Sequence, residues 1–216
     1  ENIIIYDEKY IHVWPIHPYD RLVDLIKERK WDNLSIGVEM DSHYYTAYCH
    51  QKLLNGLPNA KIKDSERLVN WVRLVKSDAE IKLMNIASQI TELGMKTAFE
   101  VINPGVRQCD AVAKIYSTLI RGTKDHGGDY SSIVPLLPTG KGTSASHLTW
   151  SDDKFVQGEA SIIEISGVYK KYHCPMARTV LLGKPDQKKI DTMKKTREAL
   201  EAGIDATKPG NTADDV

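Results

Sequence analysis

The chain has 216 residues, of which 41% are hydrophobic and 27% are charged, as in an ordinary globular protein. This length allows one domain, or two small ones, with a buried core. Lys plus Arg and Asp plus Glu number 29 each, so the charge balance argues against nucleic acid and membrane surfaces as partners. No apolar run reaches the roughly 20 residues that a membrane helix needs.

Residues 1–66 alternate short strand signals with helical ones. A β-branched run and two buried apolar runs predict strands, and apolar residues on a helical period predict helices between them. The predicted strands are 2–6, 34–38 and 60–63, and the predicted helices are 19–30 and 42–54. Alternation of this kind is typical of an α/β layer.

The pattern changes over residues 64–76, and we place a domain boundary between residues 66 and 67. Ser77-Asp78-Ala79-Glu80 has the form of a capping box and predicts the start of a long helix, which Asn103-Pro104-Gly105 ends. Further helices are predicted over 107–120 and 186–206, and strands over 133–137, 160–169 and 176–182. A turn at Lys208-Pro209-Gly210 then precedes the start of another helix at Thr212. Residues 67–216 therefore predict an α+β domain.

Glu164 is the most informative candidate for chemistry. Side chains alternate along a strand, so Ile162, Glu164 and Ser166 share one face of the predicted strand 160–169. A carboxylate in so apolar a strand is costly unless it is paired or protonated. It is either one half of a structural ion pair, with Arg178 on the next strand as its partner, or a catalytic carboxylate.

Other candidates carry weaker signals. His147 lies in a turn-rich segment, where a lone His is more often structural or exposed. His173 and Cys174 stand together at the mouth of the predicted hairpin, as an activated thiolate with its base or as a weak metal-ligand pair. Trp150, Tyr169 and Tyr172 either line a cationic pocket with their π faces or pack in the core.

Several segments together resemble the creatinase/prolidase/aminopeptidase P family. RLVNWVRLVKSDAEI (residues 67–81) is similar to the linker and first helix of that family's catalytic domain, and EALEAGIDATKPGNTADDV to a later helix, Pro-Gly turn and helix. His147 aligns with the family's substrate-contacting His, and Arg178-Thr179 with its Arg-Thr pair. The resemblance covers essentially the whole chain. It implies a pita-bread catalytic domain over 67–216, preceded by the end of a small α/β N-terminal domain over 1–66.

The chain departs from this family at the metal ligands. The resemblance aligns two family aspartates, eleven positions apart, with Glu164 and Pro175. Two-metal hydrolysis needs bridging and terminal carboxylates around ions about 3.5–4 Å apart, and Pro175 has no side-chain donor. We therefore expect no metal and no other cofactor.

The motifs SASHLTW, EISG and KKYHCP resemble those of the ectoine hydrolases within the family. That resemblance implies a small zwitterionic substrate, a cyclic amidine that is opened to N-acetyl-2,4-diaminobutyrate. It implies that Glu164 acts as the general base or the nucleophile and that His147 carries the proton to the leaving nitrogen. Substrate-binding positions are then expected at Trp150, Tyr172, His173 and Cys174.

Alternatives remain open at this point: a metal-dependent Xaa-Pro aminopeptidase or prolidase, a creatinase-like amidinohydrolase, and a non-catalytic binding module. The resemblance also implies a homodimer. Cys49, Cys109 and Cys174 are widely spaced and form no CxxC pair, which favours a cytoplasmic location. The chain lacks an initiator Met and a second half carrying the family's remaining His and Glu positions, so we expect a fragment lacking both ends.

Overall fold

The computed structural model describes residues 3–216, which form two compact units. The first unit ends at Lys76 and the second begins at Ser77, which is later than the predicted boundary between residues 66 and 67. Between the two positions lies a short helix that the sequence pattern did not indicate, α3 (Leu68–Leu74). This helix ends before the capping box at Ser77 and falls within the first unit.

The first unit is a small α/β layer, as predicted. Its strands β1 (Ser35–Val38) and β2 (Lys61–Asp64) run parallel, with Ser35 opposite Lys61. The helix α2 (Ala47–Gly56) connects them, as a crossover between parallel strands requires. The helix α1 (Pro18–Glu28) packs against α2. Five buried side chains form the core: Val23, Ile26, Val38, Leu53 and Leu57.

Two predicted elements of this unit differ from the structure. Residues 3–6 form no strand and their side chains are exposed, and residue 2 lies outside the described residues. A strand needs a partner edge, and within the described residues the sheet of this unit pairs only β1 with β2. The helix predicted over 42–54 begins later, because the Thr46 side chain accepts a hydrogen bond from the Cys49 N–H and caps α2 there. A one-turn 3-10 helix, η1 (Glu8–Tyr10), precedes α1.

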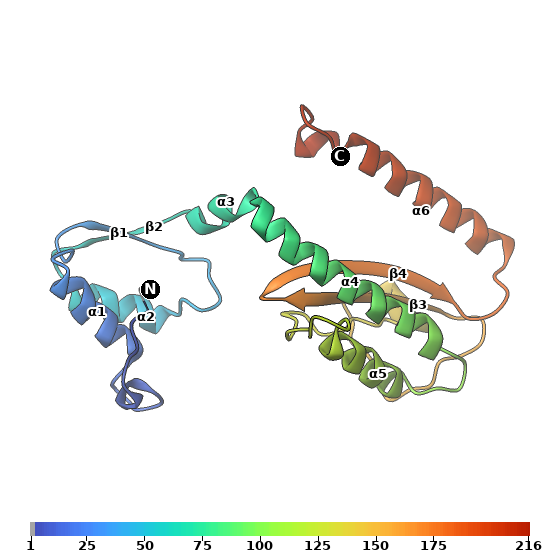
Figure 1. Ribbon diagram of the computed structural model, residues 1–216, viewed down its shortest axis with the longest axis horizontal. Helices are drawn as coiled ribbons and strands as arrows, with labels where there is room; N and C mark the ends of the chain where they lie inside the picture. Colours follow the sequence, from blue (N-terminus) through green and yellow to red (C-terminus); the bar gives the residue numbers. More distant parts are fainter. Residues whose placement is uncertain (1–2) are drawn as a thin grey trace. The chain divides into compact units, whose positions relative to one another are not determined.

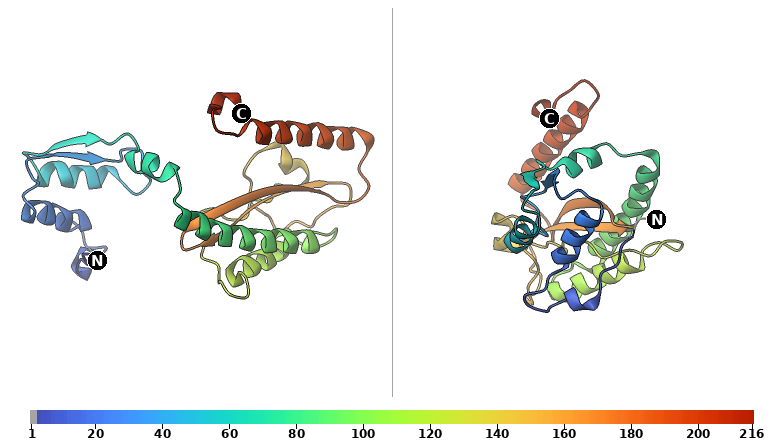
Figure 2. Two further views of the ribbon diagram at one scale, coloured as in Figure 1. Left: turned by 45° about the horizontal axis from the view of Figure 1, so that its top comes forward. Right: turned by 90° about the vertical axis from the view of Figure 1, so that its left-hand side faces the viewer.

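The second unit has the predicted α+β character. Its strands β3 (Ala160–Tyr169) and β4 (Tyr172–Leu181) form an antiparallel hairpin. The long helix α4 (Asp78–Val101) packs against both strands, and α5 (Gln108–Arg121) packs against α4 (Figures 1 and 2). Remaining elements are η2 (Gly140–Ser144), α6 (Gln187–Ala206), which has no buried side chain, and η3 (Ala213–Asp215). In the described part of the chain, no helix is long and apolar enough to cross a membrane.

The core of this unit lies between the two helices and the hairpin. Apolar residues of α4 and α5 meet the buried residues of β3 and of the loops beside it. The buried members are Ile90, Met95, Ala98, Ile102, Ala111, Val112, Ile115, Leu119, Leu137, Phe155, Ile163, Ile165 and Leu182. Burial of these side chains supplies the main stabilising free energy of the unit.

The strand predicted over 133–137 is not a regular strand. Leu136 and Thr139 pair with Glu164 and Ser161 at single bridges along the edge of β3 that faces away from β4. Pro135 and Pro138 explain the irregularity, because proline has no N–H to donate to a ladder. The segment is therefore held beside β3 by a few bonds only.

The hydroxyl of Thr91 joins α4 to both strands of the hairpin. The side chain is fully buried, and its Oγ1 accepts a hydrogen bond from the Gly167 N–H at 2.8 Å. The same oxygen lies 2.6 Å from the carbonyl oxygen of Cys174, to which it donates, and 3.0 Å from that of Ala87. A Cβ added at Gly167 would lie 2.5 Å from the Thr91 nitrogen, so glycine is what lets the helix approach.

The isosteric substitution Thr91→Val tests this junction. It removes the hydroxyl and leaves a buried N–H and a carbonyl without this partner, which should lower the free energy of unfolding by about 2 kcal/mol. Thr91→Ser keeps the hydroxyl and serves as the control. Urea unfolding followed by tryptophan fluorescence measures both variants. Equal losses in the two variants would mean that the methyl group, and not the hydroxyl, stabilises the junction.

Candidate functional site

Glu164 and His147 are brought together by the fold, although they lie on different segments. The Nε2 of His147 is 3.8 Å from the Oε2 of Glu164, which is an ion-pair distance and too long for a hydrogen bond. The Glu164 side chain is 30% exposed and that of His147 is 73% exposed. The carboxylate is thus not buried as the strand pattern predicted, and solvent or a small molecule can reach both groups.

Arg178 does not form the ion pair with Glu164 that the sequence left open. The register of the hairpin puts Arg178 opposite Ile163 and Ala177 opposite Glu164. Directly opposite residues share a face, so Arg178 belongs to the face that Glu164 does not use. Its Nη1 donates instead to the carbonyl oxygen of Ala177.

Pro175 shares the face of Glu164 and is its diagonal neighbour across the strands. It stands opposite Ser166, and diagonal pairs of this kind are about 7–8 Å apart. Glu164 donates its backbone N–H to the carbonyl oxygen of Leu136 and accepts from the Leu136 N–H, so both of its backbone polar groups point away from β4. The same direction is expected for Ser166, two residues further along the strand. Pro175 and Ser166 are therefore a pair without hydrogen bonds between β3 and β4, and the missing N–H of the proline removes no hydrogen bond from the hairpin.

The side chains on this face do not fit a two-metal centre. Glu164 offers one carboxylate, and the diagonal position across from it is a proline with no donor. Throughout residues 3–216, no group of three or more His, Cys, Asp and Glu side chains is arranged to hold a metal ion.

His173 lies on the same face but further along the strands. It is opposite Val168, four residues from Glu164, a separation of about 14 Å. Its Nδ1 is 3.0 Å from the carbonyl oxygen of Lys171, which can only accept, so Nδ1 carries the proton. Its Nε2 accepts from the Ser132 N–H at 3.1 Å and lies 2.9 Å from Ser132 Oγ. The ring is therefore neutral and fastens residues 131–133 to the hairpin.

The structure does not place Tyr172 or Cys174 beside Glu164. Tyr172 is opposite Tyr169, about 17 Å along the strand, and its hydroxyl donates to Oε1 of Glu80 at 2.9 Å. That contact ties the hairpin to the capping box of α4. Cys174 is opposite Gly167 and thus on the face that α4 covers, and its thiol is free. Their predicted substrate contacts remain predictions.

Trp150 packs on the core of the second unit. Its ring meets that of Tyr116 in α5 edge to face, with centroids 6.4 Å apart. Burial raises the pKa of the Tyr116 phenol above its ordinary value, so this hydroxyl stays neutral. The contact with Tyr116 helps to fix the loop that carries His147 and Trp150. The predicted role of Trp150 over a substrate ring remains a prediction.

A cavity of about 700 Å³ adjoins this loop. Leu148 and Thr149, the two residues after His147, line it together with Gln108 and Leu137, but Glu164 and His147 do not. In the described residues the Glu164–His147 pair therefore lies on an open face of the hairpin, outside the cavity.

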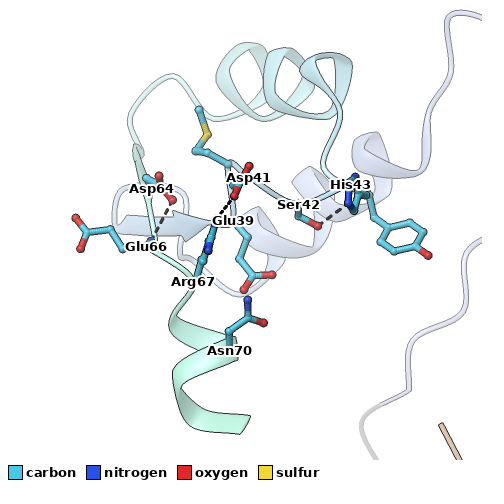
Figure 3. A pocket seen from close by; sticks show the side chains of 10 residues that line it. Glu39, Asp41, Ser42, His43, Asp64, Glu66, Arg67 and Asn70 are labelled. Carbon is cyan, nitrogen blue, oxygen red and sulfur yellow. Dashed lines mark hydrogen bonds and ion pairs between the residues drawn. The ribbon is translucent and has the colours of Figure 1, made fainter. Parts of the chain in front are cut away.

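The first unit contains a separate hollow that the sequence pattern did not indicate. It has a volume of about 710 Å³ and lies where the loops after β1 and β2 leave the same edge of the sheet (Figure 3). Ligands of α/β sheets often bind at that edge. Carboxylates line the hollow, among them Asp41, which pairs with Arg67, and Asp64, which accepts from the Glu66 N–H at 3.0 Å. Part of the charge and hydrogen-bonding capacity of these carboxylates is therefore already used within the hollow.

Comparisons with known proteins give the chain a family. The family model of metallopeptidase family M24 matches residues 82–216, and that of the Creatinase/Prolidase N-terminal domain matches residues 1–75. The chain belongs to metallopeptidase family M24. The predicted membership of the creatinase/prolidase/aminopeptidase P group is thereby confirmed.

The relatives with curated names include an ectoine hydrolase of Halomonas elongata, 41% identical over 222 residues. The match covers 100% of this chain and 56% of that protein. An uncharacterized hydrolase/peptidase of Sinorhizobium fredii is 39% identical, over 100% of this chain and 55% of its own length. The chain thus spans about half the length of these relatives.

Solved structures confirm the predicted pita-bread fold. Prolidase from Pyrococcus furiosus superimposes with a TM-score of 0.77 at 21% identity, covering 91% of this chain and 55% of that one. X-Pro aminopeptidase from Thermotoga maritima gives a TM-score of 0.73 at 19% identity. At these identities the likeness establishes the fold and leaves the reaction open.

The hydrogen bonds of His173 predict its tautomer. A two-bond ¹H–¹⁵N spectrum of the histidine-labelled protein at neutral pH should give the pattern of a ring protonated at Nδ1. Ser132→Ala should keep that pattern, because the backbone N–H still donates to Nε2. A ring protonated at Nε2 would contradict the fastening of Ser132 to the hairpin.

Proposed function

We propose that the complete protein is a metal-independent hydrolase that opens the cyclic amidine ring of ectoine to N-acetyl-2,4-diaminobutyrate. The observation that carries the proposal is the Glu164–His147 pair on the face where Pro175 occupies the diagonal position. The 41% identity to an ectoine hydrolase across the whole chain supports the substrate class. A cytoplasmic location and a homodimer belong to the same proposal.

The chemistry of a cyclic amidinium suits this pair of residues. The ring is planar and cationic, and a carboxylate can accept charge-assisted hydrogen bonds from its N–H edge. Glu164, held at the surface of β3, then either removes a proton from water or attacks the amidine carbon itself. We favour direct attack, because Pro175 removes a donor that a hydroxide-generating metal pair needs.

The overall step consumes one water. In direct attack, a bond forms between a Glu164 carboxylate oxygen and the amidine carbon, one ring carbon–nitrogen bond breaks, and the released nitrogen takes a proton. Water then adds to the same carbon and the bond to Glu164 breaks, which frees the carboxylate. His147, within 3.8 Å of Glu164, is placed to give a proton to that nitrogen and to recover one from the water that follows. The products keep both nitrogens, one as an amine and one in an acetamide.

Xaa-Pro dipeptidase activity is the second candidate, since the family includes such enzymes and their structures match this fold. Creatinase-like cleavage of a guanidino acid is a third. The full-length protein should be assayed side by side with ectoine, creatine and an Xaa-Pro dipeptide. Turnover of ectoine alone is the expected result, and turnover of the dipeptide alone would overturn the proposal.

Glu164→Gln tests the role of the carboxylate. It keeps the size of the side chain and removes the base or nucleophile, so kcat on ectoine should fall at least about a hundredfold. Gln187→Glu, a change of the same size in reverse at an exposed position, is the control and should behave like the wild type. NMR of the acetyl methyl group measures turnover. Normal turnover by Glu164→Gln would show that the carboxylate has no part in the reaction.

A further inference from the structure

His147 depends on its backbone for its place beside Glu164. Its side chain is largely exposed, so packing does little to hold the ring. The residue also adopts a left-handed conformation, with φ of 60°, which a non-glycine residue keeps only when its surroundings impose it. The place of His147 therefore depends on the contacts of the loop that follows it, residues 148–153.

One anchor of this loop comes from the strand side. Leu136 pairs with Glu164 through two backbone hydrogen bonds, of 2.9 and 3.0 Å. The next residue, Leu137, donates its N–H to the carbonyl oxygen of Leu148 at 2.9 Å. The residue after His147 is thus two hydrogen-bonding steps from the strand that carries Glu164.

The second anchor comes from α5 and centres on Gln108. This side chain is only 7% exposed, and its Oε1 accepts a hydrogen bond from the Ser151 N–H at 3.0 Å. The backbone N–H of Gln108 donates to the carbonyl oxygen of Asp153 at 2.9 Å, and the backbone N–H of Cys109 donates to the carbonyl oxygen of Ser151 at 3.1 Å. The first N–H groups of a helix have no partner within the helix, and here they bind the loop.

The α5 anchor is rigid because the helix itself is fixed in the core. Ala111, Val112 and Ile115, which follow in its next turns, are fully buried. A buried amide oxygen without a hydrogen-bond partner is costly, so the Gln108 side chain is not free to leave Ser151. Loop residues 148 and 151 are therefore held from two sides, and His147 projects from the held end.

We propose that Gln108 is a positioning residue of this site: its buried side chain holds the Ser151 backbone and thereby sets His147 opposite Glu164. The inference rests on the proposed function, since it assigns the positioned pair to ectoine hydrolysis. Gln108 acts on the pair through the loop, by way of its bond to the Ser151 N–H.

Two substitutions in the full-length protein separate the hydrogen bond of the Gln108 side chain from the space that the side chain fills. Gln108→Met keeps the size and removes the acceptor, whereas Gln108→Glu keeps an acceptor and suits the first turn of a helix. Gln187→Met makes the same change at the first residue of α6, where the side chain is exposed, and is the matched control. Gln108→Met should lower kcat on ectoine about ten- to hundredfold with KM within about threefold, and Gln108→Glu should restore most of it.

Hydrogen exchange and NMR test the geometry independently of turnover. The Ser151 amide should exchange at least about tenfold faster in Gln108→Met than in the wild type or Gln187→Met. Glu164→Gln should shift the His147 ring signals in the wild-type background and leave them nearly unchanged in the Gln108→Met background. A wild type that does not hydrolyse ectoine but gives these results would end the proposed function and keep the positioning role.

Three results would overturn the inference. An unchanged Ser151 exchange rate in Gln108→Met would mean that the side chain does not hold the loop. Unchanged kcat and unchanged His147 coupling despite faster exchange would mean that the hold does not position the ring. Equal losses in Gln108→Met and Gln108→Glu, with a matching fall in Tm, would reduce Gln108 to a structural residue.

Discussion

The close approach of α4 to the hairpin is the constraint on which the second unit depends. Gly167 leaves no side chain between strand and helix, and the Thr91 hydroxyl fills the gap with bonds to both strands. With this face of β3 covered by the helix, the alternation of side chains leaves Glu164 and Pro175 on the other face. The helix contact thus decides which side of the hairpin can carry chemistry.

The position of His147 follows from the same strand. The edge of β3 away from β4 binds Leu136, Leu137 binds the loop after His147, and Gln108 holds that loop to α5. The first two links are backbone–backbone hydrogen bonds, and the third joins the buried Gln108 side chain to the Ser151 N–H. An exposed histidine and a partly exposed carboxylate can therefore keep a defined distance without being buried themselves.

Local signals in the sequence were sufficient for much of the fold. The capping box at Ser77, the Asn-Pro-Gly stop and the alternation over 160–169 predicted α4 and β3 within a few residues. The strand over 133–137 was wrong as a regular element, because Pro135 and Pro138 limit its pairing to single bridges. The helix α3 was missed because Arg67 before it offers no side-chain cap.

For the site, the sequence indicated Glu164 and His147 but not Gln108. Nothing in the local pattern around Gln108 reveals a hydrogen bond to Ser151, 43 positions away.

We propose that the Glu164 carboxylate works without the metal pair whose second ligand position is Pro175 in this chain. The most direct test is ectoine turnover by the full-length protein after exhaustive chelation, with metal content measured on the same sample. We predict full ring opening in a sample that holds far less than one metal ion per chain. Loss of turnover on chelation, with recovery when a divalent metal is returned, would contradict the account.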